Sequence, residues 1–84
     1  MDDGIEFNEA AFRHDVSEED IRWAAMHSLY EDLLEGCSNK YLVLGYDDTK
    51  RRLLEIMYNR IDDDTVNVFH AMKCTKKYLP LVGF

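Results

Sequence analysis

The chain has 84 residues, of which 46% are hydrophobic and 12% are aromatic. This length suits one small domain over residues 1–84, which would bury roughly 60% of the surface that the unfolded chain exposes. The hydrophobic fraction excludes wholesale disorder, and no apolar run approaches the roughly 18 residues of a membrane span. The acidic N-terminus lacks the apolar segment of a signal peptide, so we expect a cytoplasmic protein that does not bind membranes.

Charge is unevenly distributed along a chain whose formal net charge is -7. Residues 1–36 hold eleven acidic and two basic side chains, whereas residues 37–84 hold eight basic and six acidic ones. The first half therefore repels phosphate and suits a basic protein partner, while the second half can attract phosphate locally.

Cysteine and histidine spacing argues against a metal site. Cys37 and Cys74 form no Cys-x-x-Cys pair, and His14, His27 and His70 have no ligand spacing relative to them. Structural zinc needs four donors, usually in close pairs, and a disulfide is not expected in a reducing cytosol. We therefore expect neither a metal nor another cofactor.

The N-terminal segment over residues 4–13 has two interpretations. Ile5 and Phe7 alternate with polar residues, as they would in a short edge strand. Asn8 could instead cap a turn of helix over residues 9–13.

A helix is predicted over about residues 18–28. Ser17 is a favourable N-cap, and Asp20 stands where a capping box has Glu or Gln. Trp23 lies off the centre of the apolar stripe and is expected to be a partly buried lid. The stripe itself recurs at helical spacing and comprises Ile21, Ala24, Ala25, Ser28 and Leu29.

The middle of the chain predicts strands joined by turns. Residues 29–34 form either a short strand or the frayed end of the helix, and residues 36–39 form a turn. Residues 41–46 are apolar throughout, which favours a central strand, and residues 47–50 make a hairpin loop.

Two further strands and a tail complete the predicted fold. A strand over about residues 52–59 is followed by an acidic turn at 62–64 and a last strand. On that last strand, Val66, Val68 and His70 are expected on one face, and Asn67, Phe69 and Ala71 on the other. Residues 73–79 are expected to form a helical turn that stops near Pro80. The predicted class is α+β, with an N-terminal helix packed on a small antiparallel sheet of three to four strands.

Basic and aromatic residues follow the last strand and begin the preceding one. Cleavage of RNA by its own 2′-hydroxyl needs a base, an acid and cations that hold the phosphate. His70 is the candidate for proton transfer and Lys73 for the catalytic cation. Antiparallel pairing would bring both to the same end of the sheet as the candidate RNA-binding residues, which are Arg51, Arg52, Lys76, Lys77 and Tyr78.

Each of these residues also has a structural interpretation. His70 can be a hydrogen-bonded histidine at the margin of the core, and Tyr78 can pack its ring on the sheet. Lys76 and Lys77 can be solvated surface residues. Arg51 and Arg52 can neutralise the acidic hairpin loop at residues 47–50.

Four segments together resemble a known family, and their order and spacing extend over about 65 of the 84 residues. Residues 13–19 (RHDVSEE) resemble a Lys-His-Gly-Val-Ser helix start, and residues 40–45 (KYLVLG) and 52–58 (RLLEIMY) resemble two central strands. Residues 70–78 (HAMKCTKKY) resemble the closing segment. The family is that of the BrnT-type toxins, in the RelE/ParE-like group of bacterial toxin–antitoxin systems.

The resemblance implies a RelE/BrnT-like toxin that cleaves RNA or blocks translation and is inhibited by a small cognate antitoxin. Arg52, Lys73 and Lys76 fall on basic positions of the family pattern. The chain departs from that pattern at Asp15, where the family has glycine, and at Met72, where many members have arginine.

Two functional hypotheses follow. The first is a toxin that acts as a metal-independent endoribonuclease or a translation inhibitor, with RNA or the ribosome as its target. The second is a non-catalytic interaction module that keeps the toxin fold and docks through its acidic half.

Overall fold

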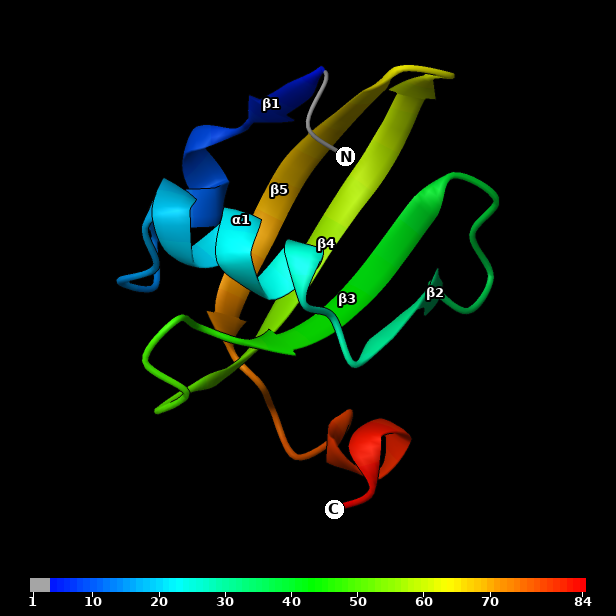
Figure 1. The fold of residues 1–84 in the computed structure, drawn as a ribbon. Helices are drawn as coiled ribbons and strands as arrows, with labels where there is room; N and C mark the ends of the chain where they lie inside the picture. The colour runs from blue at the N-terminus through cyan, green and yellow to red at the C-terminus, as the bar shows by residue number, and fades with distance from the viewer. Residues whose placement is uncertain (1–3) are drawn as a thin grey trace.

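The computed structural model describes residues 4–84 as one α-helix and a five-stranded sheet (Figure 1). The sheet order is β1-β5-β4-β3-β2, with β1 parallel to β5 and every other pair antiparallel. The elements in chain order are β1 (Ile5–Phe7), the 3-10 helix η1 (Glu9–Phe12), α1 (Glu18–Met26), β2 (Tyr30–Leu33), β3 (Lys40–Tyr46), β4 (Leu53–Asp62), β5 (Thr65–Lys73) and the 3-10 helix η2 (Leu79–Val82).

The α+β class is confirmed, but the predicted sheet of three to four antiparallel strands is wrong. The sheet has five strands among the described residues and is mixed, and the helix lies between β1 and β2 rather than ahead of all the strands. The difference arises at β1, which pairs in parallel with the distant β5. Residues 1–3 of the expected domain lie outside the described part of the chain.

Both interpretations of the N-terminal segment hold, one after the other. Ile5–Phe7 forms the edge strand, and Asn8 then caps η1 by accepting a hydrogen bond from the Ala10 N–H at 2.9 Å. A strand and a capped turn therefore fit into the same ten residues.

The predicted start of α1 is confirmed. Ser17 Oγ accepts from the Asp20 N–H at 3.1 Å, and Asp20 Oδ2 accepts from the Ser17 N–H at 2.9 Å, which completes a capping box. The helix ends at Met26, two residues before the predicted end. Trp23 is exposed, with its ring stacked on His27 at 4.2 Å between centroids.

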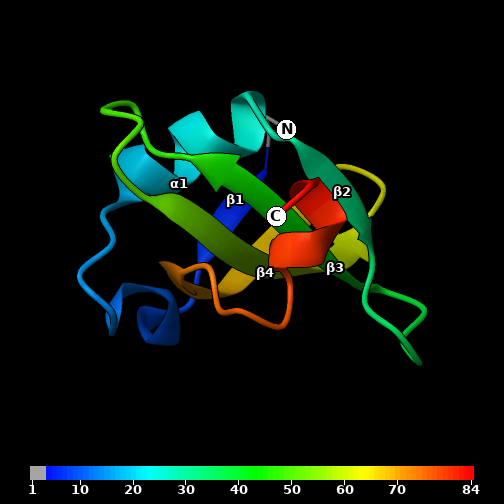
Figure 2. The same cartoon turned by 90° about the horizontal axis from the view of Figure 1, so that it is seen from below.

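Helix α1 packs on β3 and β4 while η1 packs on β5, and Figure 2 shows α1 along one side of the strands. Gly45 of β3 permits this close packing, because a Cβ there would lie 2.4 Å from the Ala24 carbonyl oxygen. The core between the helix and the sheet is formed by Ala11, Val16, Ile21, Ala24, Val43, Leu54, Ile56, Tyr58, Val68 and Ala71.

A β-bulge in β5 changes which residues share a face. Met57 pairs with His70 while Tyr58 pairs with Val68, so Phe69 is an extra residue in β5. Val68 and Ala71 are both buried in the core, on the face of β5 where η1 packs. The prediction that His70 shares a face with Val66 and Val68 is therefore wrong, because the extra residue reverses the alternation and turns His70 to the opposite face.

The predicted strands at residues 29–34 and 52–59 are confirmed with shifted boundaries, whereas the predicted helical turn over residues 73–79 is wrong. The segment 29–34 forms a strand, β2, and β4 continues to Asp62, three residues beyond its predicted end. After Lys73 the helical turn comes later than predicted, as η2. Pro80 lies at its start rather than at its end, where the missing N–H costs no helical hydrogen bond.

Candidate functional site

A buried carboxylate on β4 organises the site. Glu55 is 3% exposed and lies on the face opposite α1. Its Oε2 lies 2.9 Å from His70 Nε2, and its Oε1 accepts a hydrogen bond from the Thr75 N–H at 2.8 Å. The Glu55 carboxylate can accept a hydrogen bond from Nε2 in the forms of His70 that carry a hydrogen on that nitrogen, which leaves Nδ1 outside this contact. Glu55 thus fixes both the histidine and the chain that follows β5.

A second histidine adjoins the first. The His14 ring meets the His70 ring edge-on, with 5.9 Å between ring centroids. His14 comes from the loop between η1 and α1 and is exposed, whereas His70 is partly buried. Two imidazoles and one carboxylate from three separate segments therefore converge at one margin of the sheet.

This arrangement is suited to proton transfer. A carboxylate behind an imidazole orients the ring and stabilises the imidazolium that forms when the ring takes a proton. A second imidazole can supply the opposite step, because general acid and general base are separate roles in phosphodiester cleavage. Cys74 is not an equivalent nucleophile, since burial and the nearby Glu55 carboxylate raise the pKa of its thiol.

The predicted basic residues divide into two groups around this centre. Lys76 and Lys77 are exposed and directly follow Thr75, whose N–H is bound by Glu55. Tyr78 is partly buried, and Lys77 Nζ lies 5.2 Å from the centroid of its ring. Lys73 is exposed and lies two residues after the buried Ala71. The two side chains therefore share the face of β5 that carries the core, opposite His70.

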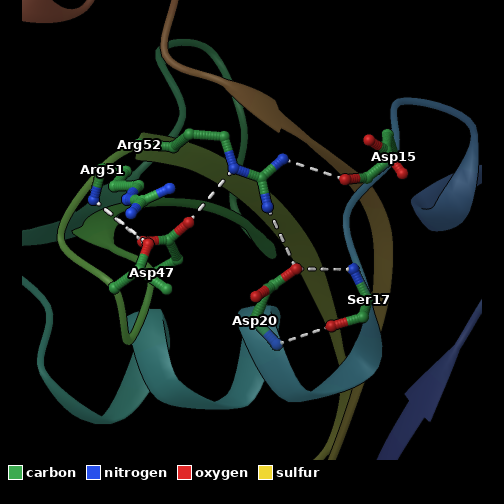
Figure 3. Close-up of polar contacts among 7 residues, drawn as sticks. Asp15, Ser17, Asp20, Asp47, Arg51 and Arg52 are labelled. Atoms are coloured by element: carbon green, nitrogen blue, oxygen red, sulfur yellow. Dashed lines mark hydrogen bonds and ion pairs between the residues drawn. The ribbon is translucent and has the colours of Figure 1, made fainter.

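Arg52 lies on the other face of β4 in a network of its own (Figure 3). Its Nε donates to Asp47 Oδ2 at 3.1 Å and one terminal nitrogen donates to Asp20 Oδ2 at 3.1 Å. The other terminal nitrogen donates to the Asp15 carbonyl oxygen at 2.9 Å. The guanidinium therefore ties the β3–β4 hairpin to the start of α1 and to the loop before it.

Asp47 is the buried centre of this second network, at 3% exposed. Burial disfavours its charged form, but hydrogen bonds from Thr49, from the Arg52 side chain and from the backbone of the hairpin hold the pKa of its carboxyl below the ordinary value. The hydrogen bond to Asp47 in turn raises the pKa of the Arg52 guanidinium, and desolvation of the guanidinium opposes this rise. Arg51 is exposed and donates only its backbone N–H to Asp47, at 3.2 Å.

The expected convergence at one end of the sheet holds for the backbone but not for the side chains. The Cys74 N–H donates to the Leu53 carbonyl oxygen at 2.8 Å, so the end of β5 lies beside the start of β4. Arg52 turns to the α1 face, where it neutralises Asp47 as its structural interpretation anticipated. The RNA-binding roles of Arg51, Arg52, Lys76, Lys77 and Tyr78 and the catalytic roles of His70 and Lys73 stay predictions.

Sequence reasoning missed two members of the site, Glu55 and His14. Glu55 could have been found as the single carboxylate inside the apolar run of residues 53–57. His14 lies in the first segment that carries the family resemblance, but its contact with His70 depends on how the loop before α1 wraps around the sheet edge.

In the comparisons with known proteins, no family model, no curated protein and no solved structure matches this chain. Within residues 4–84, no three His, Cys, Asp or Glu side chains are grouped so as to hold a metal ion. Across the same residues, no helix combines the length and apolar character needed to cross a bilayer.

Proposed function

We propose that this chain is the toxin component of a type II toxin–antitoxin pair and cleaves RNA without a metal. The observation that carries the proposal is the buried Glu55 bonded to His70, with the His14 ring beside it. An imidazole held by a carboxylate can serve as the base, and a second imidazole can serve as the acid, in acid–base cleavage of a phosphodiester.

In the proposed reaction, His70 takes the proton from the 2′-hydroxyl of the RNA. The freed oxygen attacks the adjacent phosphorus, and a bond forms between them as the bond to the 5′-oxygen breaks. His14 donates a proton to the leaving 5′-oxygen, which leaves a 2′,3′-cyclic phosphate and a new 5′-hydroxyl. Lys76 and Lys77 are exposed beside this centre and would stabilise the phosphate as its charge grows.

The backbone at Asp15 supports the proposed BrnT/RelE-like family. Asp15 has φ 58°, in the left-handed region where glycine is most comfortable and Asp is tolerated. Glycine is the residue that the family pattern has at this position. A strained position next to His14 is consistent with a loop that is fixed by the needs of the site.

The alternative is a non-catalytic interaction module with the same fold. It is favoured by the eleven acidic side chains of residues 1–36, which repel an RNA backbone. It is also favoured by Arg52, whose donors are bound to Asp15, Asp20 and Asp47 instead of facing a ligand.

Expression of the chain alone in bacterial cells separates the two functions, with growth and RNA integrity as readouts. The wild-type chain should slow growth and yield cleaved RNA. His70→Ala should lower both effects roughly a hundredfold, the scale of losing an acid–base group. Arg22→Ala is the matched control, because it removes an exposed cation on α1 that pairs with Glu18 outside the site.

Two outcomes of this experiment contradict different parts of the proposal. A wild-type chain that neither slows growth nor cleaves RNA contradicts the catalytic function and leaves the interaction module. A His70→Ala variant that is folded and fully toxic contradicts the assignment of His70 while leaving the toxin identity intact.

A further inference from the structure

The outer edge of β2 is an open sheet edge. β2 is the last strand in the sheet order, and its inner side pairs with β3. The Leu34 N–H donates to the Lys40 carbonyl oxygen at 2.8 Å, so by antiparallel alternation Glu31 and Leu33 direct their backbone groups away from β3. The Leu33 N–H is accepted instead by the Asp32 side chain, at 2.8 Å. This edge can therefore accept another strand once the Asp32 carboxylate swings aside.

An apolar hollow of about 340 Å³ adjoins the start of this edge. Trp23 and Leu29, at 41% and 57% exposed, contribute much of its apolar surface, and its lining is completed by His27, Tyr46, Asp47 and Lys50. Leu29 directly precedes β2, and Leu33 further along the strand is also exposed. An extended chain beside β2 would therefore reach the hollow with one of its side chains.

The charge around the edge specifies the occupant. Glu31, Asp32 and Glu35 are exposed along and just after β2, where the segment from Leu29 to Cys37 has no basic residue. Glu31 also accepts a hydrogen bond from the Tyr58 hydroxyl, and the hollow is lined by one residue of each charge, Asp47 and Lys50. A strand that carried acidic side chains would be repelled, whereas Lys or Arg side chains would be attracted. A second copy of β2 would bring the same acids together, which disfavours pairing of two copies through this edge.

We propose that the β2 edge and the Trp23–Leu29 hollow bind an extended segment of a partner protein in which basic and apolar residues alternate. The segment adds a sixth strand to the sheet, so backbone hydrogen bonds give affinity and the hollow gives register. That this partner is the antitoxin rests on the proposed function, whereas the binding itself does not depend on RNA cleavage.

The test uses the full ¹⁵N-labelled chain and an end-blocked eight-residue peptide of alternating Lys and Leu. Amide shifts should concentrate at residues 29–34, and the affinity should fall as salt rises. Two control peptides address the chemistry: one has Glu in place of Lys, and the other is N-methylated at alternate residues, which removes donors for strand pairing. Neither should bind measurably at the same concentration.

A proline substitution gives a matched variant in the protein. Leu33→Pro deletes an N–H that does not bond to β3, and proline is tolerated on an outward-facing edge position. It should weaken peptide binding about tenfold, as the loss of a backbone hydrogen bond predicts. Leu33→Ala keeps the N–H and should weaken binding much less.

Shifts that avoid residues 29–34, equal binding of the N-methylated peptide, or no binding at all would overturn the proposal. Dimerisation of the chain that is lost in Leu33→Pro would also overturn it, in favour of a second copy. None of these results bears on RNA cleavage. The proposed function can therefore be wrong while the β2 edge binds the peptide, and the β2 edge can fail to bind while the chain cleaves RNA.

Discussion

Arg52 directly precedes β4 and Glu55 lies three residues later within it, and their side chains lie on opposite faces of the sheet. Arg52 is surrounded by acceptors of the protein, at Asp15, Asp20 and Asp47, and its network ends within the fold. The Glu55 network instead leads outward through His70 to the exposed His14. Because its three acceptors belong to the protein itself, the Arg52 guanidinium contributes to the stability of the fold. A buried charge that ends on an accessible imidazole can also direct protons.

The largest effect should come from breaking the contact between Glu55 and His70. Glu55→Gln keeps the side-chain volume and an acceptor for the Thr75 N–H, but it removes the charge behind His70. RNA cleavage should fall about a hundredfold with the fold retained. Cleavage rates and thermal unfolding measured on the same preparation check this. An unchanged rate would show that Glu55 serves structure alone.

Breaking the contact between Arg52 and Asp47 should lower the free energy of unfolding. Arg52→Ala leaves Asp47 buried without its charge partner, and the free energy of unfolding should drop by about 2 kcal/mol. Arg51→Ala is the control, because Arg51 donates only its backbone N–H, and it should change stability by under about 0.5 kcal/mol. Denaturant unfolding of both variants decides between them. Equal losses would contradict the structural role of the Arg52 side chain.

These two networks mark what the sequence could and could not predict. The Ser17 cap, the strands and the α+β class follow from local patterns that the structure keeps. The position of His70 could not be predicted from alternation, because the bulge at Phe69 is a property of strand pairing rather than of local sequence. The pairing of Arg52 with the nearby Asp47 was anticipated, but its contacts with Asp20 and Asp15 could not be, since these acceptors lie 32 and 37 residues away along the chain.

A smaller effect is expected at the cap of α1, where Asp20 serves both the helix start and Arg52. Ser17→Ala removes the acceptor of the Asp20 N–H and should cost about 1 kcal/mol. The denaturation midpoint should fall at an unchanged slope. An unchanged midpoint would mean that the Arg52 contact alone holds the start of the helix in place.

The smallest effect is expected from Asp47, whose carboxylate should make the free energy of unfolding depend on pH in the acid range. The pKa of Asp47 is lowered in the folded chain, so its ionised form contributes stability above the ordinary Asp pKa of about 4. This contribution is lost as the pH falls through the lower folded-state pKa. Unfolding measured from pH 6 to pH 2 should show a shallower loss in Asp47→Asn, whereas Asp48→Asn, at an exposed position, should behave as wild type.

Metal-independent cleavage at His70 is tested by incubating RNA with the purified chain in the presence of a metal chelator, with and without ribosomes. We expect cleavage by the wild-type chain, products that end in a 2′,3′-cyclic phosphate, and a roughly hundredfold loss in His70→Ala. Absence of cleavage by the folded wild-type chain under both conditions, or equal cleavage by His70→Ala, would contradict it.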